Sequence, residues 1–425
     1  MDIEHLTDKM RQEILTADRD RLIFNDFQGA LPALRQTGLY SLFRRMPKGR
    51  LMHAHIEATF DVRYLLSLCL ACDDVYVFLG AGTAGNPHCQ LAHRAWFPGL
   101  EPPAGWVNLK NAVAAEPVLI DKLFDLCTFH KSDIDDNIWP KFEDIFDRYK
   151  GVTTYRPFFI KILTKVFTDM AAERLTGVDL RYINQSIFDE DGRRLTSDEY
   201  LAQLKEIEAE VQKTYPDFDF KVIYCYYKGV PLETVPERLA LARYLQETYP
   251  EVFLGYDMVG GEDCGKDLLY YAPALKEAGV PIIMHAGETV DPNNRNIEYA
   301  LDLGIKRIGH GMNLYRYPET EARVKAGNVM LEVCPISNQV LGYVPDLKDH
   351  PAGGYIKRGL NVTINSDDCS IFDTAYITDD LLLAFLCWDL TMADIKRCLK
   401  NSLCGDKAKE AMFESSWKEF EATLQ

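Results

Sequence analysis

The sequence has no long hydrophobic run and no excess of positive charge, and these absences exclude several classes of protein. Its longest apolar runs, such as residues 381–387, are far shorter than the roughly 20 residues that cross a bilayer, so we expect no membrane span. The acidic N-terminus lacks a basic segment followed by an apolar core, which predicts a cytoplasmic protein. A formal net charge of −17 disfavours nucleic acid and anionic membranes as partners, because both require clustered Lys and Arg. Neutral or cationic small molecules remain possible partners.

The cysteines give little sign of disulfides or of a thiolate metal site. There are eleven, so at least one is unpaired, and several lie in apolar segments where a thiol acts as a small hydrophobic group. We therefore expect reduced thiols. Cys69 and Cys72 have the spacing of a redox or zinc pair, but no second pair accompanies them, which favours packing within a helix.

Two regions differ in pattern from the rest of the chain. Residues 1–45 alternate charged and apolar positions, which predicts one or two amphipathic helices ahead of the main domain. Between about 73 and 137 the periodicity degrades while Gly, Pro, Trp and His accumulate, which indicates an insertion or lid after the first strand. We therefore divide the chain into an N-terminal helical extension over 1–45 and a main domain over 46–425 that carries the insertion.

Elsewhere short apolar runs alternate with helical periodicity, although length alone would allow one large core or two ordinary ones. The predicted strands span residues 50–55, 178–183, 219–226, 252–258, 281–285, 306–309, 328–333 and 361–365. Helical patterns separate most of them, and the chain is helical again from residue 378. Eight strands alternating with helices, without a glycine-rich phosphate motif after the first, favour a (β/α)₈ barrel over a doubly wound sheet.

Polar residues gather where the predicted strands end. His53, His55, His285, His310 and Asp367 all lie at or just beyond the carboxyl end of a strand, which is the face where barrel enzymes carry their sites. Residues i and i+2 of a strand share a face, so His53 and His55 can reach one metal ion. A single histidine at a strand end is more often a hydrogen-bonded polar group, but four of the nine histidines at such ends indicate a shared site.

Three imidazoles and one carboxylate are the donors of a catalytic zinc or iron site with room for water. We assign His53, His55, His285 and Asp367 as the metal ligands. A closed structural site usually includes thiolates among its protein ligands and leaves no position for water. A divalent metal lowers the pKa of its bound water toward about 7, which suits hydrolysis of a C–N or an ester bond. The spacing does not name the bond.

Three further residues have a place in this chemistry. Glu288, one loop step beyond His285, is placed to move a proton. His310 stands between two glycines, so it can approach closely and orient the attacking group. Asp368 can accept a hydrogen bond from the substrate, although Asp367 and Asp368 alone would form an Asx turn as readily as a site.

Five stretches resemble the motifs of the adenosine deaminase family of metal-dependent amidohydrolases, in the family's order. They are His53-Ala-His55, His285-Ala-Gly-Glu288-Thr289, Arg307-Ile-Gly-His310-Gly311, residues 332–339 and Ser366-Asp367-Asp368. Residues 46–49 and 139–146 are similar to markers of the growth-factor class within this family. The resemblance runs from about residue 40 to residue 420. It implies a (β/α)₈ barrel with one zinc ion that converts adenosine or 2′-deoxyadenosine to inosine and ammonia.

The resemblance also implies roles for individual residues. Glu288 would protonate the purine ring nitrogen, His310 and Asp367 would orient the zinc hydroxide, and Asp368 would meet the five-membered side of the ring. Gly260 would offer its backbone to the ring.

Two more implications concern the wall of the pocket and assembly. Trp139 would form one wall of the pocket. In the growth-factor class the helices before the barrel help to form a homodimer, which suits residues 1–45.

Two positions depart from the family pattern where the sugar is expected to bind. An acidic residue usually follows the second histidine by one or two positions, and here Ile56 leaves only Glu57 to serve. Tyr227 stands where the growth-factor class carries a histidine after its third strand. The alternatives are therefore a deaminase of another aminopurine, modified nucleoside or amino-heterocycle, or a non-catalytic growth-factor-like binding protein.

Overall fold

A computed structural model describes residues 3–18, 22–81, 87–135, 138–183 and 187–424. Its centre consists of two four-stranded parallel sheets, with strand orders β1-β5-β6-β7 and β11-β10-β9-β8. The strands are β1 (Arg50–His55), β5 (Gly177–Ile183), β6 (Asp219–Tyr227), β7 (Phe253–Val259), β8 (Met284–Ala286), β9 (Arg307–His310), β10 (Met330–Val333) and β11 (Asn361–Ile364). Each predicted strand of the barrel is present.

Isolated bridges connect the two sheets at both seams. Tyr256 of β7 pairs in parallel with Ile282, and Ala54 of β1 pairs in parallel with Asp367. At the second seam the backbone N–H of Asp367 donates to the carbonyl of His53 at 3.1 Å. These contacts bring the first and last strands together, which is the arrangement of the predicted (β/α)₈ barrel. The seam also places the predicted ligands of β1 and β11 side by side.

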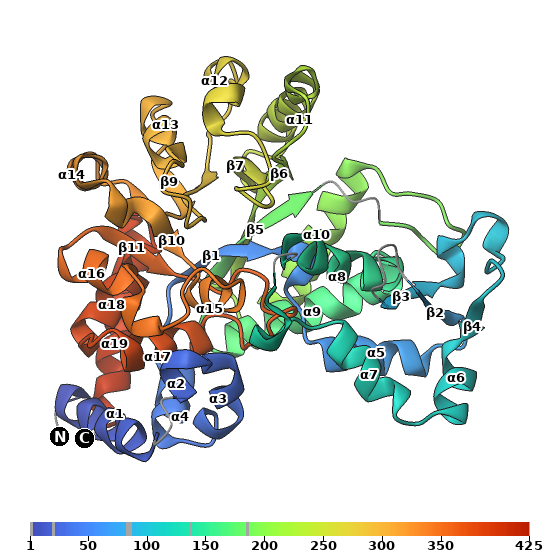
Figure 1. Cartoon of the computed structure of the whole chain (residues 1–425), viewed down its shortest axis with the longest axis horizontal. Helices are drawn as coiled ribbons and strands as arrows, with labels where there is room; N and C mark the ends of the chain where they lie inside the picture. The colour runs from blue at the N-terminus through green and yellow to red at the C-terminus, as the bar shows by residue number, and fades with distance from the viewer. Residues whose placement is uncertain (1–2, 19–21, 82–86, 136–137, 184–186, 425) are drawn as a thin grey trace.

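Helices surround the strands on the outside of the barrel (Figure 1). They include α9 (Arg156–Ala172), α10 (Ser197–Gln212), α11 (Val235–Thr248), α12 (Leu268–Lys276), α13 (Asn296–Asp302), α14 (Pro318–Ala326), α16 (Ala352–Lys357) and α18 (Met392–Asn401). Helix α10 shows why the sequence folds this way. Thr196 and Glu199 form a capping box at its start, and its buried residues, from Tyr200 to Val211, recur at helical spacing. None of the described helices is long and apolar enough to span a membrane.

The N-terminal segment forms four short helices, where the sequence predicted one or two. They are α1 (Ile3–Ala17), α2 (Leu22–Asn25), α3 (Phe27–Leu34) and α4 (Gly38–Arg45). The side chains of Asp26 and Thr37 each accept a backbone hydrogen bond as N-caps, so a new helix begins at each of them. Phe43 packs on Phe385 of α17 (Thr378–Cys387), with ring centroids 5.4 Å apart. Figure 1 shows both termini beside this helical layer.

The region predicted as an insertion contains a small antiparallel sheet, which the sequence pattern did not predict. Its strands are β2 (Val75–Ala81), β3 (Pro87–His93) and β4 (Trp106–Asn108), with β2 in the middle. Helices α6 (Leu109–Ala115) and α7 (Leu119–Leu126) follow, and α5 (Val62–Ala71) precedes it. Next comes α8 (Ile138–Thr153), whose Gly151 lies so close to β3 that an added Cβ would be 2.7 Å from the Ala92 Cβ. The sheet therefore braces α8 beside the barrel.

All eleven cysteines are free. Cys69 is buried in α5, and Cys72 follows the end of that helix. This position agrees with the predicted role of the pair in helix packing.

Candidate active site

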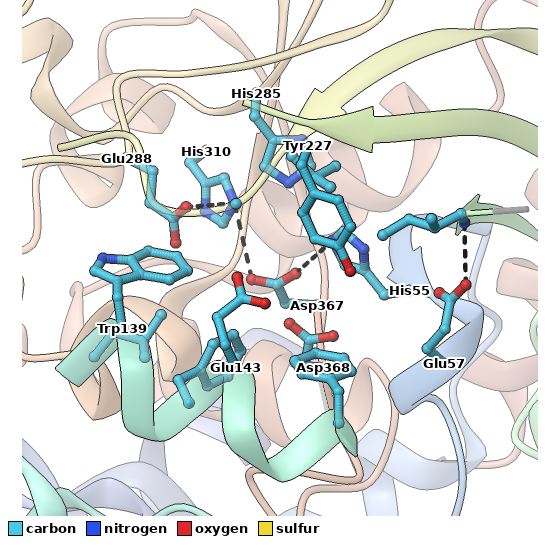
Figure 2. A pocket seen from close by; sticks show the side chains of 16 residues that line it. His55, Glu57, Trp139, Glu143, Tyr227, His285, Glu288, His310, Asp367 and Asp368 are labelled. Carbon is cyan, nitrogen blue, oxygen red and sulfur yellow. Dashed lines mark hydrogen bonds and ion pairs between the residues drawn. The ribbon is translucent and has the colours of Figure 1, made fainter. Parts of the chain in front are cut away.

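A pocket lies at the carboxyl ends of the barrel strands (Figure 2). Its lining residues are His55, Glu57, Trp139, Phe142, Glu143, Phe146, Ile183, Tyr227, Val259, Gly260, His285, Glu288, His310, Leu341, Asp367 and Asp368. The structure therefore places every residue that the sequence assigned to catalysis or substrate binding in the wall of one pocket. Of the assigned ligands, only His53 does not line it.

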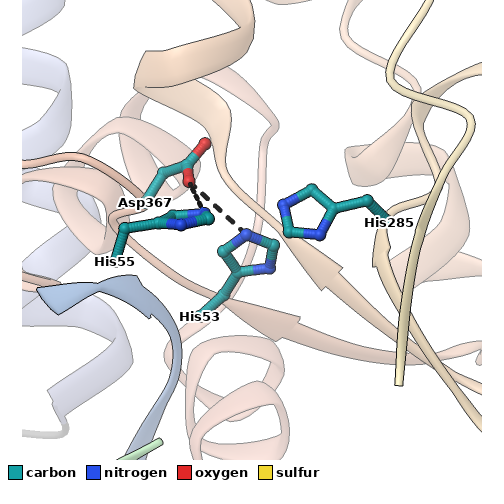
Figure 3. Close-up of side chains that lie close together, drawn as sticks. All are labelled: His53, His55, His285 and Asp367. Atoms are coloured by element: carbon teal, nitrogen blue, oxygen red, sulfur yellow. Dashed lines mark ion pairs between the residues drawn. The ribbon is translucent and has the colours of Figure 1, made fainter. Parts of the chain in front are cut away.

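Four side chains at this pocket could hold a metal ion (Figure 3). One donor atom from each of His53, His55, His285 and Asp367 lies within 4.8 Å of the other three. The Asp367 Oδ1 is 3.4 Å from the His53 Nε2 and 3.3 Å from the His55 Nε2. The fully buried His53 Nε2 makes no hydrogen bond to any described residue. A buried imidazole nitrogen without a hydrogen bond, beside a carboxylate, fits a divalent cation.

Burial favours the neutral form of two of these imidazoles, His55 and His285, and this is the form that binds metals. It lowers the pKa of His55, and it lowers the pKa of His285 to about 3 despite the nearby Asp257. For Asp367, burial alone would raise the pKa, but the neighbouring His53 and His55 side chains hold it well below its ordinary value. Neutral nitrogens and an ionised carboxylate thus face one another across the site.

In two of these histidines, the Nδ1 atom contacts a buried carboxylate. The His285 Nδ1 lies 2.7 Å from the Asp257 Oδ2, and the His53 Nδ1 lies 3.2 Å from the Glu332 Oε2. Such a contact fixes the ring orientation and leaves Nε2 for a metal. The sequence analysis missed Asp257 and Glu332 as partners. Both are charged residues inside predicted buried strands, where an ionised group needs a partner, and this could have marked them.

His310 lies between the metal-binding group and Glu288. Its Nε2 is 3.7 Å from the Glu288 Oε2 and 3.8 Å from the Asp367 Oδ2. Both His310 and Asp367 have left-handed backbone conformations, with φ of 63° and 58°, and such strain concentrates at functional sites. Gly309 permits the close approach, because an added Cβ would lie 2.8 Å from the His53 Cε1.

His310 also belongs to a second set of side chains that could hold a metal. This set consists of His53, His310, Cys334 and Asp367. Burial, followed by the charge of Asp367, raises the pKa of the Cys334 thiol well above its ordinary value. A protonated thiol is a poor ligand, so the set containing His55 and His285 suits a metal better.

Glu288 is a buried carboxyl held in a rigid loop. The backbone N–H groups of Gly287 and Glu288 donate to the two carboxylate oxygens of Glu262, each at 2.9 Å. Burial, together with the charges of Asp367 and Glu262, raises the pKa of Glu288 well above its ordinary value. The shift favours the protonated acid, the form that can donate its proton to a bound molecule.

Asp368 has a similar environment on the other side of the pocket. Burial and the charges of Asp367 and Glu288 raise its pKa well above the ordinary value. Its Oδ1 is buried and makes no hydrogen bond to the described residues. Because a buried polar atom normally has a partner, this oxygen is free to bind a polar atom of a substrate.

Comparison with known proteins decides the family. A profile described as adenosine deaminase matches residues 117–415. The chain belongs to the adenosine deaminase family. It is therefore a deaminase, a hydrolase that acts on C–N bonds, of the metal-dependent amidohydrolase type. The matched range begins after His53 and His55, so the place of these two residues in the site rests on the geometry described above.

Similar proteins agree with this assignment. Adenosine deaminase 2 from Dictyostelium discoideum is 28% identical over 386 residues, covering 87% of this chain and 70% of its own. Adenosine deaminase 2 from Sus scrofa is 28% identical over 420 residues, covering 92% and 82%. These relatives support the resemblance to the growth-factor class that the sequence motifs indicated.

Solved structures of other deaminases share the fold at low identity. Adenine deaminase from Arthrobacter aurescens has a TM-score of 0.61 at 19% identity, covering 89% of this chain and 99% of its own. N6-mAMP deaminase from Arabidopsis has a TM-score of 0.62 at 16% identity, covering 90% and 99%. An amidohydrolase with bound Zn from Burkholderia ambifaria has a TM-score of 0.64 at 17% identity, covering 92% and 96%.

The outer part of the pocket of this deaminase differs in character from the part near the histidines. The Glu57 Oε1 accepts a hydrogen bond from the backbone N–H of Ile183 at 3.0 Å, and burial raises the pKa of Glu57 to about 7. Tyr227 is 38% exposed at the opening. The Trp139 Nε1 donates to the Tyr343 hydroxyl at 3.0 Å. Of the two positions that depart from the family pattern, Tyr227 lines the pocket, whereas Ile56 is buried beside it and does not line it.

Helix α8 contributes residues that the sequence analysis missed. Phe142, Glu143 and Phe146 follow Trp139 at helical spacing and line the pocket with it. Figure 2 shows Glu143 on the same helix face as Trp139. Burial, with a contribution from Asp147, raises the pKa of Glu143. The spacing of the three aromatic residues was the available signal, since it marks one face of the helix.

Proposed function

We propose that this protein is a zinc-dependent deaminase that converts adenosine or 2′-deoxyadenosine to inosine and ammonia. The observation that carries the proposal is the buried Glu288 carboxyl, next to His310, beside a group of donors that can hold one metal ion. His53, His55, His285 and Asp367 would bind zinc, and the same donors would also accept iron. The bound metal would supply Lewis-acid activation of the water that replaces the amino group.

The other side chains have roles that follow from their protonation states. Glu288 donates a proton to the purine ring nitrogen, which makes the neighbouring carbon more electrophilic. His310, with its neutral ring between Glu288 and Asp367, orients the attacking water by hydrogen bonding. The ionised Asp367 accepts a hydrogen bond from that water, because its pKa stays low.

The pocket wall suits a purine. The free Oδ1 of Asp368 would bind the five-membered side of the ring, and the backbone at Gly260 would contact its six-membered side. Trp139, Phe142 and Phe146 supply the apolar walls.

The charges of the pocket favour a nucleoside over a nucleotide. Glu57, Glu143 and Asp368 are carboxyl groups of the lining, and no Lys or Arg of the described chain lines the pocket. A phosphate placed there would meet these carboxyl groups without a cation to pair with it. The fold neighbour named N6-mAMP deaminase acts, by its name, on a nucleotide. We infer that this chain does not share that preference.

The test is a substrate panel with the purified, metal-loaded protein. Adenosine and 2′-deoxyadenosine should release ammonia and lose the adenine absorption band as inosine forms, while AMP should react far more slowly. Release of ammonia from none of the aminopurines, with metal bound, would contradict the proposal.

A second candidate is a deaminase of another aminopurine, a modified nucleoside or an amino-heterocycle. Ile56 and Tyr227 favour it, because they replace polar groups that the family uses near the sugar. Adenine, N6-methyladenosine and an aminopterin in the same panel separate the two candidates. A cellular effect that persists unchanged in Glu288→Gln would support a growth-factor-like role instead.

We also propose a homodimer that the helices of residues 1–45 help to form, and a cytoplasmic location. Light scattering on the full chain tests the dimer, and a monomer at micromolar concentration would contradict it. Cell fractionation tests the location.

A further inference from the structure

The barrel interior beneath the histidines contains a chain of buried ion pairs. At its centre is Arg181 of β5, which is 0% exposed. Its Nε donates to the Asp257 Oδ2 at 2.8 Å, and its Nη2 donates to the Glu332 Oε2 at 2.7 Å. Its Nη1 donates to the carbonyl of Met52 at 3.1 Å, one residue before His53. One guanidinium therefore joins two carboxylates and a strand backbone.

These two carboxylate oxygens are the same atoms that contact the histidines. The Asp257 Oδ2 is 2.7 Å from the His285 Nδ1, and the Glu332 Oε2 is 3.2 Å from the His53 Nδ1. Arg181 thus lies one carboxylate away from both histidines at once. The two histidines come from opposite sheets of the barrel, so Arg181 links their orientations across the interior.

We infer that Arg181 is a positioning residue that holds His53 and His285 in the orientation in which both turn Nε2 toward one metal ion. Each carboxylate is also held at its other oxygen, Asp257 by the backbone N–H of His285 at 2.9 Å and Glu332 by Arg307. The planar guanidinium fork holds the two oxygens that contact the histidine rings, and it does so for both carboxylates together. This inference rests on the metal-ligand part of the proposed function and requires nothing of the substrate.

Two neighbouring arginines provide a graded comparison. Arg307 donates to the Glu332 Oε1 at 2.6 Å and to the Asp179 Oδ2 at 2.9 Å, so it supports only the His53 side. Arg50 pairs with Asp179 and Asp219 and donates to the Val178 carbonyl at 2.8 Å, so it touches neither carboxylate that orients a histidine. All three are cations in buried ion pairs of the same barrel. They differ in how many histidines they reach.

The experiment replaces each arginine by lysine in the full chain, which keeps the charge and removes the planar fork. Zinc affinity is measured by competition with a chelator, and the Co²⁺-substituted proteins report ligand geometry by their absorption spectra. Arg181→Lys should weaken zinc binding by roughly 10- to 100-fold and change the Co²⁺ spectrum, as loss of such support does in other metal sites. Arg307→Lys should have a smaller effect, and Arg50→Lys should bind zinc as the wild type does.

Thermal unfolding of the metal-free proteins separates positioning from general stability. Wild-type zinc affinity and Co²⁺ spectrum in Arg181→Lys would overturn the inference, and so would an equal loss in Arg50→Lys. If Arg181→Lys does not fold, Asp257→Asn and Glu332→Gln test each side alone, and wild-type affinity in both would overturn it. Because these measurements use no substrate, they can succeed even if the proposed reaction is wrong.

Discussion

The metal end of the pocket and its mouth are built in different ways. At the metal end, His53, His55, His285 and Asp367 come from the ends of barrel strands, and buried carboxylates orient two of them. At the mouth, Trp139 and Glu143 come from α8, the helix after the insertion. Glu57 lies just after β1, and Tyr227 is the last residue of β6.

This difference separates chemistry from selectivity. Side chains in a buried network depend on one another, so a change at the metal end should abolish the reaction. The mouth has fewer shared contacts, and Tyr227 is 38% exposed there. We therefore expect changes at the mouth to alter which substrate binds while the reaction continues.

The largest effect is expected from loss of the metal. His285→Ala, or treatment with a chelator, should reduce deamination to the background rate, because the attacking water is no longer activated. Metal binding also stabilises the fold by mass action, by about 2.7 kcal/mol when the metal is at about 100 times its dissociation constant. Thermal unfolding with and without chelator measures this stabilisation.

His5→Ala is the matched control for that variant, since His5 is exposed on α1. It should keep both activity and metal content. If the chelator removes the metal and the melting temperature stays the same, metal binding does not stabilise the fold.

The second largest effect is expected from the proton donor. Glu288→Gln keeps the size of the side chain and removes its titratable proton, so kcat should fall by about 10²- to 10⁴-fold. Zinc content should stay unchanged, because Glu288 is not one of the proposed ligands. In the wild type, activity should fall as pH rises through the raised pKa of Glu288, because the ionised form has no proton to donate.

Glu319→Gln on the exposed face of α14 serves as the control. Wild-type kcat in Glu288→Gln would show that another group donates the proton to the substrate. Steady-state kinetics over a pH series, with the metal content measured in each sample, provides the comparison.

The same contrast explains how much of the structure was predictable. The eight barrel strands and the polar residues at their ends are local features of the chain, since an apolar run and its last residues lie together in sequence. The sheet of β2, β3 and β4 was missed although its strands pair with near neighbours in the chain, because Gly, Pro, Trp and His in this region obscure the alternation that marks a strand. The caps at Asp26 and Thr37 divided a helical pattern that periodicity alone would continue.

Within the site, the residues that touch a metal or a substrate were easier to predict than those that hold them. Arg181, Asp257 and Glu332 each look like an isolated charge in a buried strand, and only the fold shows that they meet. Glu143 resembles any solvated glutamate on an amphipathic helix. Its place in the pocket depends on how the inserted sheet braces α8.

A smaller effect is expected at the mouth from Glu143→Gln. If this carboxylate accepts a hydrogen bond from the substrate, KM for adenosine should rise about 10-fold, which corresponds to about 1.4 kcal/mol, with little change in kcat. Discrimination against AMP should weaken, because one negative charge is gone. Glu319→Gln, the exposed variant on α14, again serves as the control. A fall in kcat with KM unchanged would show that Glu143 acts in the reaction and not in substrate binding.

The smallest effect is expected from Glu57, whose pKa burial raises to about 7. Below this pH the carboxyl is neutral, and above it the ionised form makes stronger hydrogen bonds with sugar hydroxyls. KM for adenosine should therefore fall a few-fold between about pH 6 and about pH 8. Glu57→Gln should remove this pH dependence and leave the pH dependence that Glu288 gives to kcat. If kcat follows Glu57 instead, the mouth and the metal end form one electrostatic unit, and their separation does not hold.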